Sequence, residues 1–316
     1  MQPLTENDPR TVGGYRLRAL LGTGGMGRVY LGESRAGDEV AVKVIKPSAL
    51  DEEARARFAL EVHSLKGVMG ARVAAFAAAD AEADQPWLAV EYVAGPDLRA
   101  LVWDAGPLPV VETASLGALL TEGLDSIHRR GLLHRDLKPQ NVVVAKDGPK
   151  IIDFGLAVLA ERRTSLTAKD TVVGSVVCMS PEQARGEFTL TTAVDIHALG
   201  ATLLYAATGH YPYSGPSWHP VALAIADPAT APDLSGLPAE LTPLLSAMLA
   251  SDPAERPTSA AVLDGLVGVI EQAGTTPARA RRLWAARVPE RDDVPELPAV
   301  PASEPVAYTP AVLDVA

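Results

Sequence analysis

The segment HRDLKPQN, residues 134–141, says more about chemistry than any other stretch of the 316-residue chain. It brings together a carboxylate at Asp136, a cation at Lys138 and an amide at Asn141. A carboxylate can orient a hydroxyl group and accept its proton, while a cation can absorb charge on phosphoryl oxygens. The amide oxygen of Asn141 is a ligand type that suits Mg²⁺. The segment therefore predicts a loop that supports phosphoryl transfer to a hydroxyl group.

The segment IIDFG, residues 151–155, follows a short distance downstream. Its apolar start is typical of a strand that delivers Asp153 to a cleft, with Phe154 as a packing anchor. Asp153 would add a second oxygen ligand for a metal ion to that of Asn141. A turn residue is the alternative for Asp153, and a loop or helix-cap residue is the alternative for Asp136.

The segment LGTGGMGRVY, residues 21–30, places four glycines inside ten residues. Because glycine is costly in regular structure, the segment is either a flexible surface turn or a backbone that approaches something closely. The spacing Gly22-x-Gly24-x-x-Gly27-x-Val29 fits a dinucleotide-binding turn and also a flap over ATP phosphates. The glycines open onto a β-type run and not onto a helix, which argues against the dinucleotide interpretation.

A lysine on an apolar strand follows the glycines, in AVKV at residues 41–44. Lys43 is placed to contact nucleotide phosphates, and Glu61 in the predicted helix from Asp51 to about Lys66 could pair with its ammonium group. A solvated strand lysine and an ordinary helix glutamate are the alternatives.

Hydrophobic periodicity divides the chain into a β-rich part and a helical part. Short β-type runs are expected at residues 15–21, 28–31, 40–45 and 87–93, and helical patterns dominate from Asp97 onward. We therefore predict an α+β fold of two lobes with a cleft between them. The small β-rich N-lobe spans residues 15–93, the larger helical C-lobe spans residues 97–270, and residues 1–14 form an N-terminal extension.

Composition and charge limit the class of protein. The formal net charge of −11 argues against a protein that holds nucleic acid by broad phosphate neutralisation. The single cysteine, Cys178, cannot form an intramolecular disulfide, so a reducing compartment is expected, and a packed residue is favoured over a redox switch. Residues 196–208 are too short to span a bilayer and should form a buried helix. With no signal-peptide pattern, a cytoplasmic location is expected, and a membrane anchor beyond residue 316 stays open.

The C-terminal part, residues 274–316, is a Pro/Ala-rich tail, and its segment PELPAVPASEPVAYTP, residues 295–310, should be disordered or extended. Its first portion, PARARRLWAARVPERDD, could form one short basic helix carrying Trp284. A helix packed loosely on its own domain is favoured over one that touches a membrane surface or a partner. This part is either a terminal tail or a juxtamembrane linker.

The ordered set of motifs resembles the family of eukaryotic-like protein kinases, especially the bacterial Hanks-type serine/threonine kinases. The resemblance runs from about Tyr15 to Ile270, a protein kinase domain of residues 15–270. It includes MSPE at residues 179–182, and it adds Asp195 in DIHALG and Arg256 in ERP.

The resemblance implies an ATP- and Mg²⁺-dependent protein kinase, with Mn²⁺ as a substitute metal. Asp136 and Lys138 are its implied catalytic residues, and Lys138 points to serine or threonine as acceptor. Asn141 and Asp153 are the implied metal ligands. The implied ATP-binding residues are Leu21, Gly22, Gly24, Gly25, Gly27, Val29, Ala41, Lys43, Glu61, Glu91 and Val93. The implied supporting residues are His134, Arg135, Phe154, Ser175, Glu182, Asp195 and Arg256.

Regulation is also implied by the resemblance. Arg135 beside the catalytic aspartate is typical of kinases whose activation loop is ordered by phosphorylation. We expect autophosphorylation at Thr171 and Thr167, ahead of Thr164, through transient homodimers. Residues 176–178 depart from the family pattern, which leaves substrate preference open.

Two other functions are weighed against this prediction. A nucleotide-binding pseudokinase scaffold is disfavoured because no core motif residue is missing. A small-molecule kinase of related fold is disfavoured because the MSPE segment and the long activation loop indicate protein substrates.

Overall fold

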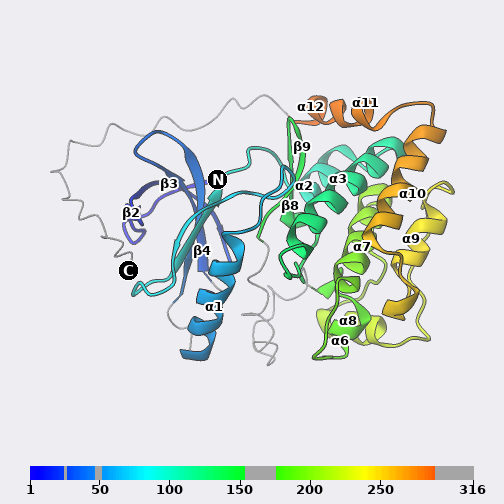
Figure 1. Cartoon of the computed structure of the whole chain (residues 1–316), viewed down its shortest axis with the longest axis horizontal. Coiled ribbons are helices and arrows are strands. Elements are labelled where there is room, and N and C mark those ends of the chain that lie inside the picture. The colour runs from blue at the N-terminus through cyan, green and yellow to red at the C-terminus, as the bar shows by residue number, and fades with distance from the viewer. Residues whose placement is uncertain (25–26, 47–51, 154–175, 289–316) are drawn as a thin grey trace, which may run out of the picture.

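A seven-stranded antiparallel sheet lies beside a larger group of helices in the computed structural model (Figure 1). The structure describes residues 1–24, 27–46, 52–153 and 176–288. The strand order is β1-β3-β4-β5-β7-β6, and β2 pairs with β3. The strands are β1 (Gln2–Pro3), β2 (Thr11–Val12), β3 (Tyr15–Thr23), β4 (Gly27–Glu33), β5 (Glu39–Ile45), β6 (Phe76–Asp80) and β7 (Trp87–Glu91).

Side-chain alternation gives the sheet an outer and an inner face. The outer face is covered by a small cluster, which we call the outer cluster, built on Leu17, Tyr30, Val40, Val42, Val44, Trp87 and Ala89. The inner face carries Ala41 and Lys43, the residues of β5 that lie between those valines. Helix α1 (Glu52–Leu65) packs beside this inner face through Phe58 and Val62.

The helical lobe is built around α7 (Ala193–Thr208), whose side chains are almost all buried. The apolar run at residues 196–208 is thus a buried core helix, as predicted. Contacts between apolar side chains join α7 to the neighbouring helices in one continuous core. The other helices are α2 (Leu98–Ala105), α3 (Val110–His128), α6 (Pro181–Ala184), α8 (Trp218–Ala226), α9 (Thr242–Met248) and α10 (Ser259–Gln272), with short 3₁₀ turns η2 (Pro139–Asn141) and η3 (Pro253–Glu255).

A two-stranded hairpin, β8 (Val142–Ala145) and β9 (Gly148–Ile151), lies between the sheet and the helices (Figure 1). Its register pairs Val142 with Ile151. Because the strands are antiparallel, the residues just before β8 and just after β9 meet at the same end of the hairpin. A parallel bridge from Val73 to Ile151 ties the hairpin to the segment that leads into β6.

Two short helices, α11 (Pro277–Arg282) and α12 (Trp284–Arg287), pack on the helical lobe after α10 (Figure 1). The Trp284 side chain is fully buried, and its Nε1 donates a hydrogen bond to Ser115 Oγ in α3 at 3.2 Å. Arg287 forms a two-point ion pair with Glu112 at 2.8 and 3.0 Å. The segment packs on its own domain, as expected, but it forms two short helices, and its packing is tighter than the expected loose contact. Burial of its aromatic ring anchors the segment to α3 and withdraws Trp284 from any membrane surface.

Three further observations complete the fold. The predicted bilobal α+β fold is confirmed, and the strands predicted near residues 15, 28, 40 and 87 are present with shifted ends.

Burial raises the pKa of the Cys178 thiol to about 12, which fits a packed residue and not a reactive thiolate. Among the residues that the structure describes, no helix is both long and apolar enough to cross a bilayer.

Candidate active site

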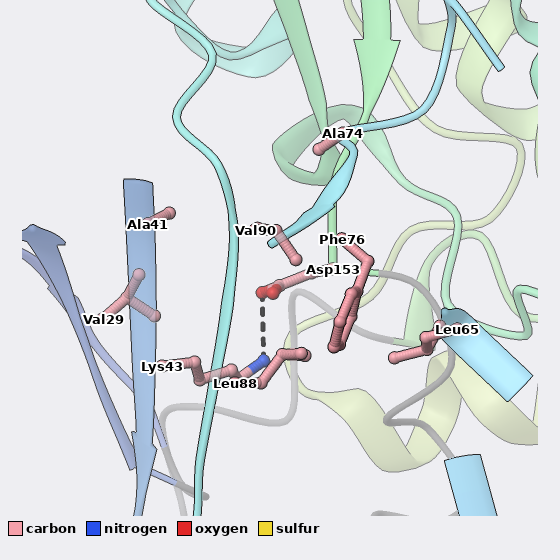
Figure 2. Close-up of a pocket in the computed structure, with 9 residues that line it drawn as sticks. All are labelled: Val29, Ala41, Lys43, Leu65, Ala74, Phe76, Leu88, Val90 and Asp153. Carbon is pink, nitrogen blue, oxygen red and sulfur yellow. Dashed lines mark ion pairs between the residues drawn. The ribbon is translucent and has the colours of Figure 1, made fainter. Parts of the chain in front are cut away.

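A pocket opens under the inner face of the sheet, between the two lobes (Figure 2). Its roof is formed by Val29 of β4 and Ala41 of β5, and Val90 of β7 closes one side. The remaining lining residues are Lys43, Leu65, Ala74, Phe76, Leu88 and Asp153. The pocket is therefore apolar apart from one ammonium and one carboxylate, a composition that suits a flat aromatic ligand with a charged end.

Lys43 and Asp153 form an ion pair across this pocket. Figure 2 shows the Lys43 side chain reaching from β5 toward the Asp153 carboxylate, with Nζ 3.1 Å from Oδ2. Burial on its own would raise the pKa of Asp153, but the Lys43 ammonium outweighs it, so the pKa lies below its ordinary value. The Asp153 side chain stays 39% exposed, so solvent also reaches the carboxylate. Asp153 is thus ionised at neutral pH and accessible to a cation.

The β8–β9 hairpin brings Asn141 close to the segment that carries Asp153. Ile152 N donates a hydrogen bond to Asn141 O at 2.9 Å. Asp153 has a positive φ of 54°, an uncommon left-handed conformation for a residue with a side chain. Such strain is concentrated at functional sites, where the surrounding structure maintains it.

The loop of residues 134–141 is held from below by Asp195 at the start of α7. Asp195 Oδ2 accepts hydrogen bonds from His134 N at 2.8 Å and from His128 Nε2 at 2.7 Å. Asp195 Oδ1 accepts from Arg135 N at 2.8 Å, and Arg135 has a positive φ of 64°. One buried carboxylate therefore stabilises the strained backbone on which Asp136 is mounted.

The polar groups of the loop converge on Asp136. Lys138 Nζ lies 2.6 Å from Asp136 Oδ2. Asn141 Nδ2 donates to Asp136 O at 2.8 Å and to Asp136 Oδ2 at 3.2 Å. These contacts orient the Asn141 amide with its nitrogen toward Asp136, so Oδ1 is the atom left to serve as an acceptor or ligand.

His134 packs beneath this loop as a neutral ring. Burial lowers the pKa of His134 and outweighs the nearby carboxylates of Asp195 and Asp136. Its Nδ1 accepts a hydrogen bond from Asp136 N at 3.3 Å, and its Nε2 lies 3.4 Å from Ile152 O. The ring therefore links the Asp136 loop to the strand end that carries Asp153.

A buried ion pair joins the segment of α6 to η3. Arg256 Nη1 and Nη2 contact the two carboxylate oxygens of Glu182 at 2.7 and 2.8 Å. Burial would raise the pKa of Glu182, but the bond from Arg256 brings it below its ordinary value. Next to Glu182, Gln183 Nε2 donates to Arg135 O at 2.9 Å. The α6 segment is thereby attached to the loop that carries Asp136.

The described glycines of the 21–30 segment have different surroundings. A Cβ on Gly27 would lie 2.0 Å from Val44 O, so the pairing of β4 with β5 excludes a side chain there. A Cβ on Gly22 or Gly24 would meet no described protein atom within 4 Å. The backbone near Gly22 and Gly24 therefore borders open space, while Gly25 lies outside the described residues.

The end of β7 and the segment after it place Glu91 and Val93 outside the pocket lining. The Glu91 side chain is engaged by Lys150 of β9, and Glu91 Oε2 accepts a hydrogen bond from Ala75 N at 3.2 Å. Val93 packs with Ala74 and Val143. Any contact of Glu91 and Val93 with a ligand in the pocket would use their main-chain groups.

Some predicted residues belong to parts of the chain that the structure does not describe, and some lining residues were not predicted. Phe154, Ser175, Thr164, Thr167, Thr171 and the side chain of Glu61 lie outside the described residues. Sequence reasoning missed the pocket residues Leu65, Ala74, Phe76 and Leu88, and it missed His128. Phe76 and Leu88 have strand-type neighbours, but no local signal distinguishes a pocket wall from an ordinary core residue.

Comparisons with known proteins agree with this geometry. The sequence model of the family described as protein kinase domain matches residues 15–266. The serine/threonine-protein kinase AfsK of Streptomyces griseus is 44% identical over 253 residues, 80% of this chain and 31% of that protein. The AfsK of Streptomyces coelicolor is 40% identical over 289 residues, 91% of this chain and 35% of that protein. The probable serine/threonine-protein kinase PkwA of Thermomonospora curvata is 43% identical over 264 residues, 83% of this chain and 35% of that protein.

The chain thus spans about a third of the length of these curated relatives. Among solved structures, Rad53 1–466 in complex with AMP-PNP superposes with a TM-score of 0.66 at 24% sequence identity. The match covers 81% of this chain and 65% of that one. At this identity the likeness establishes the fold.

Proposed function

The chain belongs to the protein kinase family, and we propose that it transfers the γ-phosphoryl group of ATP to serine and threonine hydroxyls of proteins. The observation that carries the proposal is the loop in which Lys138 and Asn141 both contact the Asp136 carboxylate. A scaffold that only bound nucleotide would not need this cluster. The backbone that carries it is strained at Arg135 and is held by hydrogen bonds to Asp195. The serine/threonine-protein kinase names of the bacterial relatives support the same acceptor chemistry.

Asp136 is proposed to orient the acceptor hydroxyl and to accept its proton. A positioned carboxylate contributes roughly 10²–10⁴-fold to such proton transfers. Lys138, at the same carboxylate oxygen, would then stabilise negative charge on the transferring phosphoryl group. This arrangement keeps the proposed base and the cation in contact with each other.

Asn141 and Asp153 fit the requirements of a Mg²⁺ site. The donor set is a carboxylate and an amide oxygen, both hard ligands that Mg²⁺ prefers, and Asp153 is ionised and partly exposed. Held by these two residues, a bound ion would supply positive charge that offsets the negative charge of the phosphates. Lys43 would contact the α- and β-phosphates, and its present ion pair with Asp153 keeps the two charged groups at the same edge of the pocket.

ATP is proposed to lie with its adenine under Val29 and Ala41. Glu91 and Val93 would offer main-chain groups to the adenine edge, and Leu21 would cover the entrance. The open space above Gly22 and Gly24 would admit the phosphates, since no Cβ obstructs the approach of main-chain N–H groups.

Regulation and cellular context are also proposals. Autophosphorylation at Thr171, Thr167 or Thr164 would give a phosphate that pairs with Arg135, and it would require a transient homodimer. A cytoplasmic site of action fits the single cysteine, and residues 15–270 are proposed as the catalytic unit.

The test is incubation of the chain with labelled ATP, Mg²⁺ and a generic protein substrate, followed by mapping of each phosphorylated residue. Asp136→Asn should lower the rate by roughly 10²–10⁴-fold. Asp147→Asn, at the exposed β8–β9 turn, is the matched control and should retain the wild-type rate. Label on serine and threonine that vanishes only in Asp136→Asn supports the proposal. Tight ATP binding with no transfer in any variant would favour the scaffold instead.

A further inference from the structure

Asp8 is a buried carboxylate in the segment that precedes the residues matched by the kinase family. The match begins at Tyr15, yet the Asp8 side chain is only 1% exposed. Aspartate is seldom buried to this extent unless its charge is paired. The structure provides these partners: Thr5 of the same segment, and Arg28 and Tyr30 of the glycine-rich hairpin.

Four hydrogen bonds converge on the two oxygens of Asp8. Oδ2 accepts from Thr5 N at 2.8 Å and from Thr5 Oγ1 at 2.7 Å, which closes a turn within the N-terminal segment. Oδ1 accepts from Arg28 Nη1 and from Tyr30 Oη, both at 2.7 Å. One oxygen thus holds its own segment, while the other holds strand β4.

The residues held by Asp8 lie on either side of a residue that lines the pocket. In β4, Arg28 and Tyr30 contact Asp8, and Tyr30 belongs to the outer cluster. Val29 between them faces the opposite way and forms part of the pocket roof. The position of this roof residue is therefore determined in part by bonds on the far side of the sheet.

The N-terminal segment is also attached to the other strand of the same hairpin. β1 pairs with β3 through Gln2 and Leu20, and β2 pairs with β3 through Val12 and Tyr15. β3 leads into the glycines, and β4 leads out of them, with Gly24 N bonded to Gly27 O at 2.8 Å. The segment therefore connects both strands that carry the glycine-rich turn.

Charge makes this connection stronger than a neutral one. The two hydrogen bonds from Thr5, followed by that from Tyr30, hold the pKa of Asp8 far below its ordinary value. The carboxylate is thus ionised at neutral pH, and hydrogen bonds to an ionised acceptor are about twice as strong as neutral ones.

We propose that Asp8 is a positioning residue for ATP binding, which acts by fixing Arg28 and Tyr30 so that β3, β4 and the glycine-rich turn keep the geometry that receives the nucleotide. This inference rests on the proposed function. It extends the working kinase unit in front of residue 15 and assigns to the N-terminal segment a role in nucleotide affinity.

The test compares Asp8→Asn and Tyr30→Phe with the wild-type chain. Asp8→Asn keeps the shape but removes the charge, while Tyr30→Phe keeps the buried ring and removes one donor. Asp38→Asn is the matched control. Asp38 is an exposed aspartate in the turn that joins β4 to β5, at the end of β4 that is far from the glycine-rich turn. Each protein is assayed for ATP dissociation constant by calorimetry, KM for ATP, KM for protein substrate, kcat and thermal midpoint.

We expect the dissociation constant and KM for ATP to rise about three- to tenfold in Asp8→Asn and less in Tyr30→Phe. The KM for protein substrate should stay unchanged, as should all values of Asp38→Asn. Amide hydrogen exchange should accelerate in residues 21–24 and 27–31 of the first two variants. Unchanged ATP affinity in both folded variants overturns the proposal, and so does an equal rise in both KM values.

The ATP dissociation constant does not depend on phosphoryl transfer. A wild-type chain that bound ATP without phosphorylating protein would refute the proposed function, while the comparison of affinities would still decide the role of Asp8.

Discussion

Lys138 Nζ lies 2.6 Å from Oδ2 of Asp136, the carboxylate oxygen that Asn141 Nδ2 also contacts. The cation and the proposed base are therefore in contact before any substrate arrives. Such pre-organisation removes the cost of bringing the groups together during the reaction. Lys138 is accordingly expected to act on the transition state more than on the binding of ATP.

Replacement of Lys138 by alanine tests this expectation. We expect kcat to fall by about 10²–10³-fold, with little change in the KM for ATP, because the lost charge stabilises the transferring phosphoryl group. Steady-state kinetics with a protein substrate measures both values. Lys146→Ala, at the exposed turn of the β8–β9 hairpin, is the control. A fall in kcat of similar size in both variants, or in neither, would contradict the assignment.

Two glycines of the glycine-rich segment, residues 21–30, should respond differently to replacement by alanine. Gly27→Ala would bring a Cβ within 2.0 Å of Val44 O, so the β4–β5 pairing must shift. We expect the free energy of unfolding to fall by about 1–3 kcal/mol, as for other overpacked sites. Gly24→Ala has room in the protein and should keep its stability while it raises the KM for ATP. Urea unfolding and ATP titration separate the two effects, and equal loss of stability would argue against the observed register.

The buried Trp284 should contribute strongly to stability even though it follows the family match. Trp284→Ala removes a fully buried ring and its hydrogen bond to Ser115, so the free energy of unfolding should fall by about 3–5 kcal/mol. Trp103→Ala is the matched control, because this tryptophan is 81% exposed and should cost less than about 0.5 kcal/mol. Chemical unfolding of both variants provides the comparison. Similar losses would mean that α12 is not docked in solution.

Local sequence patterns were sufficient to single out the Asp136 loop and to predict the strands near residues 15, 28, 40 and 87. HRDLKPQN combines a carboxylate, a cation and an amide at short spacing, and the apolar alternation of residues 40–45 is a direct sign of a strand. The contact of His128 with Asp195 has no such sign. These residues are 67 positions apart, and only the packing of α3 against α7 brings them together.

The two ends of the packed unit were harder to predict for a related reason. β1 and β2 have two residues each, which is too short for a periodic signal. Asp8 stands in a polar segment, and its burial depends on Arg28 and Tyr30 of a distant strand. Around Trp284, the many arginines indicated a solvated helix, although the indole nitrogen has its hydrogen-bond partner, Ser115, in α3.

The pH dependence of stability should depend on His197, which is buried in α7. Burial is the main cause that lowers the pKa of His197 from 6.5 to about 3, and the charge of Arg256 adds to it, while Glu182 opposes it. In the unfolded chain the imidazole would titrate near its ordinary pKa. Below that value the unfolded state binds a proton that the folded state does not, so acid favours unfolding.

We therefore expect the wild-type free energy of unfolding to decline as pH falls from about 6.5, with up to about 1.4 kcal/mol per pH unit from this one group. His197→Leu removes this titration, so its free energy of unfolding should change less than that of the wild type between pH 6.5 and 4.5. Other groups, such as the buried His134, titrate alike in both proteins and do not contribute to the difference. Urea unfolding at several pH values measures the difference. His219→Leu, a change at an exposed histidine, should leave the wild-type slope intact. Parallel profiles for wild type and His197→Leu would show that the folded protein protonates this ring as readily as the unfolded chain does.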